Sequence, residues 1–302
     1  MMIEKILIRS YETIFSDVVK HQVERVILSV AILSYIIHLL LILLTNQGIL
    51  DWKEVFFTNP ISAIYTPFSF ILIYEVFLLI FFLPKSITIY LGKQYEIITL
   101  IVIRRIFKDI AYVDLTYEWF SDKNDLQLTF DVVTSLILFY LIFLFYKKIK
   151  KRAYTTIKKN DLEGSRIKKF VLLKKALAVL LIPIFAILAF YTLTDFFIST
   201  LGDHSYGLLA FKKLNNVFFD EFFTILIIID VLLLLFSFFY SQQFYKIIRN
   251  SGFVISTILI KVSFFAEGLI NNMLIISAVL IGYIILIIHN LYEKNELAME
   301  EE

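Results

Sequence analysis

Four charged residues lie inside long apolar stretches of the sequence, and residues of these types can bind an ion or exchange a proton. Glu75 and Asp230 are acids, whereas Arg104 and Lys261 are bases. Each lies near the centre of its stretch. If the stretches cross a bilayer, a charge at that depth costs roughly 2.5 to 3.5 kcal/mol on insertion-based scales. These residues are therefore expected to pair with one another or to line a wet cavity.

The elements that must position these charges are predicted to be transmembrane helices. The chain is 59% hydrophobic and 19% charged, with a mean hydropathy of +0.81, so one soluble core could not bury its apolar surface. About 20 apolar residues span the hydrocarbon layer as a helix. We expect an all-α integral membrane protein with about eight transmembrane helices. The predicted spans are 26–45, 64–84, 95–113, 128–146, 175–194, 219–239, 252–270 and 272–290.

The last two predicted spans are separated by almost no chain. Asn271 and Asn272 lie between them and favour a tight helical hairpin. An alternative with seven spans, in which this pair merges or inserts only halfway, stays open. The number of spans therefore depends on how residues 252–290 fold.

The distribution of lysine and arginine predicts that both termini lie in the cytoplasm, because short cytoplasmic loops retain positive charge. With this orientation, 21 of the 29 basic residues are cytoplasmic. The bases of the outer loops are Lys53, Lys123, Lys212 and Lys213. The expected location is a bacterial cytoplasmic (inner) membrane, crossed many times.

The pattern of spans and charges divides the chain into five predicted regions. They are an amphipathic N-terminal helix at the cytoplasmic surface (1–24), a first four-helix repeat (25–146), a basic cytoplasmic linker (147–174), a second four-helix repeat (175–292) and an acidic C-terminal tail (293–302). The linker contains Lys147, Lys148, Lys150, Lys151 and Arg152, which are expected to contact anionic lipid headgroups. No aromatic pattern for base stacking accompanies them, so nucleic acid is not an expected partner.

An internal duplication is indicated when residues 68–81 are aligned with residues 223–236. The single acid of each segment, Glu75 or Asp230, then occupies the same position. A central base follows 29 residues after Glu75 and 31 residues after Asp230. Because each unit would hold an even number of spans, the two repeats are predicted to be parallel.

Further charged residues join the candidates for ion binding or proton coupling. They are Arg105, Lys108 and Asp109 in the third span, Glu267 near the outer end of the seventh, and His38 in the first. Arg104 is expected to meet Glu75, and Lys261 to meet Asp230. Because a lysine holds a carboxylate less firmly than a fixed arginine, Asp230 and Lys261 are the better candidates for proton coupling. Interhelical ion pairs that only hold the bundle together are the alternative.

The sequence offers no sign of catalysis. It has no cysteine, so disulfides and thiolate metal sites are excluded, and it lacks paired metal ligands, catalytic motifs and phosphate-binding glycine loops. No enzyme activity, metal or cofactor is expected. The leading hypothesis is an ion channel or an ion- or proton-coupled transporter. A non-transporting scaffold or signalling subunit, and a lipid- or quinone-handling membrane protein, are the alternatives, and homo-oligomerisation is left open.

Overall fold

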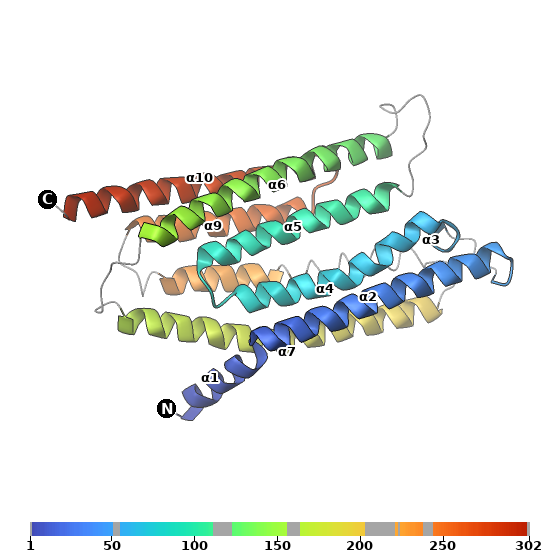
Figure 1. Cartoon of the computed structure of the whole chain (residues 1–302), viewed down its shortest axis with the longest axis horizontal. Coiled ribbons are helices and arrows are strands. Elements are labelled where there is room, and N and C mark those ends of the chain that lie inside the picture. The colour runs from blue at the N-terminus through green and yellow to red at the C-terminus, as the bar shows by residue number, and fades with distance from the viewer. Residues whose placement is uncertain are drawn as a thin grey trace. The chain divides into compact units, whose positions relative to one another are not determined.

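The computed structural model describes residues 2–50, 55–110, 123–155, 164–202, 221–222, 224–237 and 244–300, and within these ranges the secondary structure is helical without a strand (Figure 1). The helices are α1 (Met2–Ile14), α2 (Asp17–Asn46), α3 (Val55–Thr58), the 3-10 helix η1 (Pro60–Ile64), α4 (Tyr65–Phe82), α5 (Ile87–Ile110), α6 (Lys123–Thr155), α7 (Gly164–Gly202), the helix Thr224–Ser237, α9 (Phe244–Ser263) and α10 (Gly268–Glu300). The predicted all-α class is confirmed for this part of the chain.

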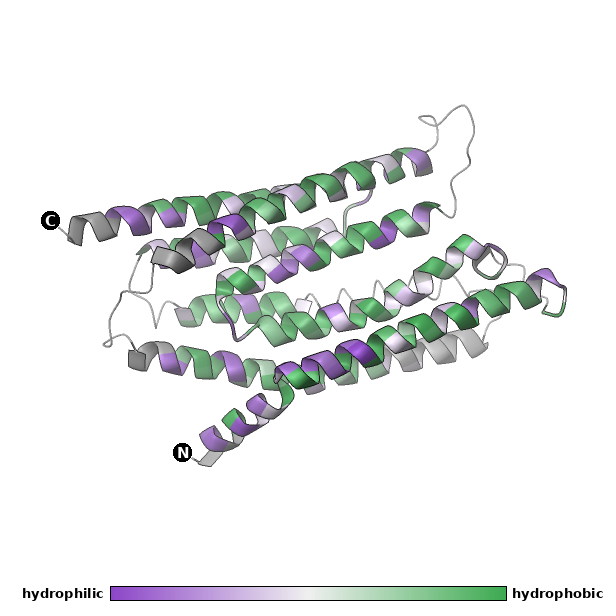
Figure 2. Cartoon of the chain, viewed as in Figure 1, coloured by the Kyte–Doolittle hydropathy of each residue, from purple (hydrophilic) through white to green (hydrophobic). Residues whose placement is uncertain are grey.

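Membrane insertion is supported by the length and hydropathy of the helices. Among the residues placed by the structure, five stretches are long and apolar enough to span a bilayer: Asp17–Asn46, Pro60–Phe82, Asp125–Ile149, Lys168–Leu188 and Gly268–Asn295. Figure 2 shows apolar residues covering much of their length. In hydrocarbon every backbone N–H and C=O must be satisfied within the protein, which favours helices for such sequences.

The other three predicted spans coincide with helices that do not reach this standard. Helix Thr224–Ser237 is short, while α5 and α9 have no stretch of 18 residues with as few as two charged residues. The structure thus supports a membrane protein with five helices of spanning character in its described part. The count of eight and the position of the termini stay predictions.

The N-terminal region differs from the single amphipathic helix predicted over residues 1–24. Helix α1 ends at Ile14, and α2 begins at Asp17 and continues into the first span. Ser16 lies between them with an extended backbone, and its hydroxyl accepts a hydrogen bond from the Val19 N–H at 3.3 Å. A serine in this position satisfies a free amide of the new helix, so it starts α2 and separates it from α1.

The hairpin near the C-terminus turns earlier than predicted. Helix α9 ends at Ser263 and α10 begins at Gly268, so Asn271 and Asn272 lie within α10. Gly268 has a φ of 62°, a conformation that glycine adopts without strain and that lets the chain reverse. The Asn271 amide donates to the Ser263 carbonyl at the end of α9. Asn271 therefore fastens the turn from inside the next helix.

The region predicted as a basic linker is helical at both ends. Helix α6 continues to Thr155, so Lys147 to Arg152 lie on it, and α7 begins at Gly164. Residues 156–163 lie outside the described part of the chain. The bases are thus presented on the end of a helix rather than on an extended loop.

The chain forms two compact units, each assembled from separate stretches. Unit 1 comprises 1–80, 101–132 and 179–222, and unit 2 comprises 81–100, 133–178 and 223–302. The predicted repeats, 25–146 and 175–292, stay a prediction from the sequence.

Unit 2 has aromatic side chains in its core. In its core, the Phe145 ring centroid lies 5.2 Å from that of Tyr95 and 6.4 Å from that of Phe253. Helices α9 and α10 run along each other within this unit (Figure 1). This packing fixes the inner faces of α5, α6 and α9.

Candidate functional site

Asp230 is the centre of a buried polar cluster in unit 2. Its side chain lies on helix Thr224–Ser237 and is 7% exposed. The Gln94 amide, from α5, donates from Nε2 to Asp230 Oδ2 at 3.0 Å. These residues are 136 positions apart in the sequence. An acid predicted to lie deep in a span is thus held by a neutral donor.

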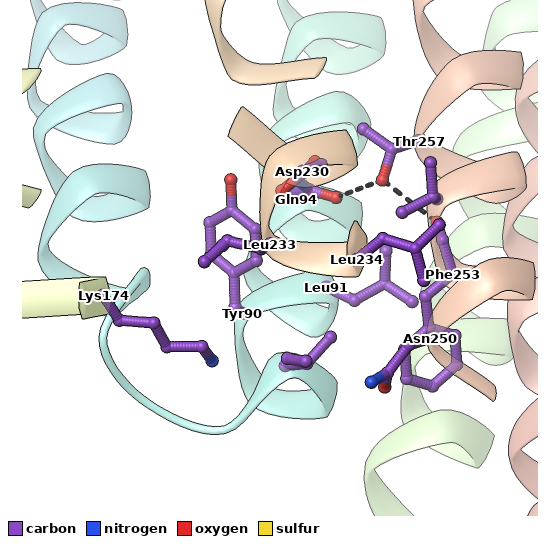
Figure 3. Close-up of a pocket in the computed structure, with 12 residues that line it drawn as sticks. Tyr90, Leu91, Gln94, Lys174, Asp230, Leu233, Leu234, Asn250, Phe253 and Thr257 are labelled. Carbon is purple, nitrogen blue, oxygen red and sulfur yellow. Dashed lines mark hydrogen bonds between the residues drawn. The ribbon is translucent and has the colours of Figure 1, made fainter. Parts of the chain in front are cut away.

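The Gln94 amide also has a hydrogen-bond partner for its oxygen. Its Oε1 accepts a hydrogen bond from the Thr257 hydroxyl of α9 at 2.9 Å (Figure 3). A primary amide both donates and accepts, and the two partners together fix which way it faces. Gln94 therefore links three helices, and it aims its donor group at the carboxylate of Asp230.

A small cavity adjoins this cluster. Its volume is about 20 Å³. The polar residues that line it are Tyr90, Gln94, Lys174, Asp230, Asn250 and Thr257 (Figure 3). The Tyr90 side chain lies beside Asp230, yet its hydroxyl has no hydrogen-bond partner of good geometry among the described residues. A cavity of this size holds one water molecule when it offers polar partners. The orphaned hydroxyl and the carboxylate are suitable partners for such a water.

Lys174 brings a base into the same cavity, a role that the sequence did not reveal. It is 3% exposed, and its ammonium donates to the Lys85 carbonyl at 2.9 Å. Lys174 was predicted to belong to the cytoplasmic linker because basic residues surround it in the sequence. In the structure it lies on α7, and a buried ammonium needs such a hydrogen-bond acceptor.

The pair predicted between Lys261 and Asp230 is not formed. The Lys261 ammonium donates to the Thr224 hydroxyl at 2.8 Å and lies 5.3 Å from the centre of the Phe265 ring. Thr224 precedes Asp230 by six residues, about 9 Å along a helix at 1.5 Å per residue. Lys261 is therefore at a different level from the carboxylate that it was expected to neutralise.

Glu75 and Arg104 are the corresponding candidates in unit 1, and their pairing stays a prediction. Glu75 is 5% exposed on α4, and Arg104 on α5 lies near enough for the two charges to attract each other. Asp230, the aligned acid of unit 2, is held by the Gln94 amide.

Arg105 forms an ion pair that the sequence analysis missed. Its Nε and Nη2 donate to the two oxygens of Asp131 at 2.5 and 2.8 Å, and Gln127 also donates to Asp131 Oδ1 at 2.8 Å. The expected partner on the same helical face was Asp109. Asp131 is fully buried and is the single charged residue between Leu128 and Tyr146, a signal that could have identified it.

The remaining candidates are not among the residues found to bond to Asp230. His38 is buried, with Nδ1 2.5 Å from the Thr66 hydroxyl, so it joins α2 to α4. Asp109 is half-buried, and Glu267 is exposed in the turn before α10. The Lys108 side chain lies outside the described atoms. Their roles in ion binding stay predictions.

Two bases of the predicted headgroup-binding group have described side chains. Lys147 is exposed, with its ammonium 5.9 Å from the centre of the Phe143 ring, and Lys148 is half-exposed. The side chains of Lys150, Lys151 and Arg152 lie outside the described part. Contact of this group with anionic lipid stays a prediction.

Comparison with known proteins finds no protein family, no curated protein and no solved structure that matches the chain.

Proposed function

We propose that this chain is an ion- or proton-coupled membrane transport protein in which Asp230 is the coupling group. The observation that carries the proposal is the way Asp230 is held. Its carboxylate is buried among apolar helices, and its hydrogen bond comes from the uncharged Gln94. Intramembrane acids are expensive, and they commonly mark ion and proton pathways.

The contrast with Asp131 supports this assignment. Asp131 is held at both oxygens by one guanidinium, and such bidentate, charge-assisted hydrogen bonds are strong. Asp230 has no arginine or lysine in hydrogen-bond contact among the described residues, although Lys174 acts on it through its charge. A carboxylate with neutral hydrogen-bond partners can exchange a proton without breaking an ion pair.

The adjoining cavity favours a proton over a larger ion. Its volume of about 20 Å³ suits one water molecule, and the Tyr90 hydroxyl lies beside it. A cation such as Ca²⁺ takes six to eight oxygen ligands, whereas two oxygens of this lining, Asn250 Oδ1 and Gln94 Oε1, already accept hydrogen bonds. A water bridging Tyr90 and Asp230 would give a proton a route to the carboxylate.

We also propose the topology inferred from the sequence. Eight spans with cytoplasmic termini would place Asp230 near the bilayer midplane, and the asymmetry of basic residues supports this orientation. Two parallel four-helix repeats in a bacterial cytoplasmic membrane complete the proposed arrangement. A channel in which the same cluster lines a pore is the other form of the transport hypothesis.

Reconstitution in liposomes tests the proposal. A pH-sensitive dye inside the vesicles should report dissipation of an imposed proton gradient by the unmodified chain. Asp230→Asn should abolish this flux while preserving thermal stability, since the amide keeps the shape of the side chain. Asp131→Asn is the matched control, which should lose stability and retain flux when folded. A folded Asp230→Asn variant with unchanged flux would refute the role of Asp230.

A further inference from the structure

A second pocket in unit 2 combines a buried arginine with aromatic and aliphatic side chains. It lies between α9 and α10, has a volume of about 150 Å³, and is lined by Tyr245, Ile248, Arg249, Ile288, His289 and Tyr292 among others. This pocket is separate from the cavity at Asp230. It is large enough for a small polar group rather than a single water.

Arg249 is fixed in position within this pocket. It is 9% exposed, and its Nε and Nη2 donate to the Asn250 carbonyl oxygen, Oδ1, at 3.2 and 3.0 Å. Its Nη1 lies 3.2 Å from Nε2 of His289, which is 2% exposed. The Tyr245 ring packs against the imidazole, with centroids 5.2 Å apart. The guanidinium is therefore preorganised. It has five N–H donors, of which these contacts involve three, and a guanidinium binds phosphate oxygens well.

The surroundings of the pocket are apolar and exposed. Ile248 and Ile288 are both 42% exposed, Tyr292 is 56% exposed and Phe244 is 69% exposed. In a chain that crosses a membrane, such side chains face acyl chains, and tyrosine is typical of the headgroup level. Free inorganic phosphate would not use these contacts, whereas a phospholipid would.

The pocket lies at the ends of α9 and α10 where lipid headgroups are expected. Arg249 lies near the start of α9 and His289 in the C-terminal part of α10, the ends predicted to be cytoplasmic. Anionic lipids attract basic residues at this surface. Lys246 lies one turn before Arg249 and adds to the positive charge of this helix end.

We infer that the pocket between α9 and α10 binds an anionic phospholipid, with its phosphate at Arg249 and His289 and an acyl chain along Ile248 and Ile288. This site is distinct from the basic residues of α6 and from Asp230. It does not depend on transport activity.

Native mass spectrometry of the full-length chain, released from detergent, tests the inference. The probes are phosphatidylglycerol, phosphatidylcholine and inorganic phosphate, each titrated separately. We expect one phosphatidylglycerol to remain bound and Arg249→Gln to weaken it at least about tenfold, the effect of hydrogen bonds to a charged group. Lys294→Gln, which removes an exposed base outside the pocket, should leave this affinity unchanged.

A second variant covers the case in which Arg249→Gln does not fold. Ile288→Trp enlarges a half-exposed side chain at the pocket and keeps the arginine, so it should also remove the bound phosphatidylglycerol. Equal retention of phosphatidylcholine, or equal affinity for inorganic phosphate, would overturn the assignment to an anionic lipid. Retention of phosphatidylglycerol by folded Ile288→Trp would overturn the location.

Discussion

Gln94 donates a hydrogen bond to Asp230 at 3.0 Å, and both side chains are buried in unit 2. The amide is held from its other side by Thr257 at 2.9 Å. This arrangement places an uncharged donor where the sequence led us to expect Lys261. The position of Gln94 therefore decides how Asp230 is stabilised.

Gln94→Met should destabilise the protein by about 1–3 kcal/mol, because a buried acceptor loses its donor. Proton flux through liposomes should fall as well if the proposed role of Asp230 is correct. Gln127→Met is the matched control, because Gln127 also donates to a buried aspartate, Asp131. This substitution leaves the hydrogen bonds from Arg105 to Asp131 in place. Thermal unfolding in detergent measures the stability. Equal losses in the two variants would argue against a special role of Gln94.

Asp131→Asn should destabilise the protein by about 3–5 kcal/mol, because it leaves the Arg105 guanidinium without its carboxylate partner. The double variant Arg105→Gln, Asp131→Asn should be more stable than the single variant. A double-mutant cycle on unfolding free energies measures the coupling between the two side chains. Additive losses would show that the pair contributes no interaction energy.

Lys174→Met should lower the melting temperature because the Lys85 carbonyl loses its buried donor. It also removes the positive charge from the cavity beside Asp230, so proton flux should change. Lys175→Met is the neighbouring control; its side chain is half-buried, and it does not line this cavity. Thermal unfolding and the liposome assay together separate the two effects. Indistinguishable flux and melting in the two variants would contradict this assignment.

Gly282→Ala should destabilise unit 2 by about 1–3 kcal/mol, the usual effect of overpacking. A methyl group at this position would collide with the Tyr95 hydroxyl, which bonds to the Ser256 hydroxyl at 2.7 Å. Adding Tyr95→Phe removes the hydroxyl and should recover part of the stability lost in Gly282→Ala. Thermal unfolding of the three variants tests this contact. A stable Gly282→Ala protein would show that α10 packs differently against α5.

Single cysteines can test the predicted topology because the chain has none of its own. With eight spans and cytoplasmic termini, Glu267→Cys in the turn between α9 and α10 should react with a membrane-impermeant maleimide added to intact cells. Lys294→Cys should react only after the membrane is opened. Labelling of both variants from the same side would refute the eight-span orientation.

The sequence by itself determined the class of structure. Apolar blocks of spanning length predict helices because an unpaired backbone group in hydrocarbon costs several kcal/mol, and the structure confirms helices there. The burial of Glu75 and Asp230 was also predictable, since each is the single acid of an apolar segment. The helices α2 and α10 begin at other residues than predicted because of local backbone geometry. Ser16 caps the start of α2, and Gly268 has a positive φ at the start of α10.

Only the tertiary structure decided which partner each buried charge meets. Asp230 binds Gln94, Arg105 binds Asp131, and Lys174 donates to a backbone carbonyl within unit 2. These choices depend on the rotation and axial offset of helices distant in the sequence. Hydropathy carries little information on either quantity, because apolar side chains cover lipid-facing and buried faces alike.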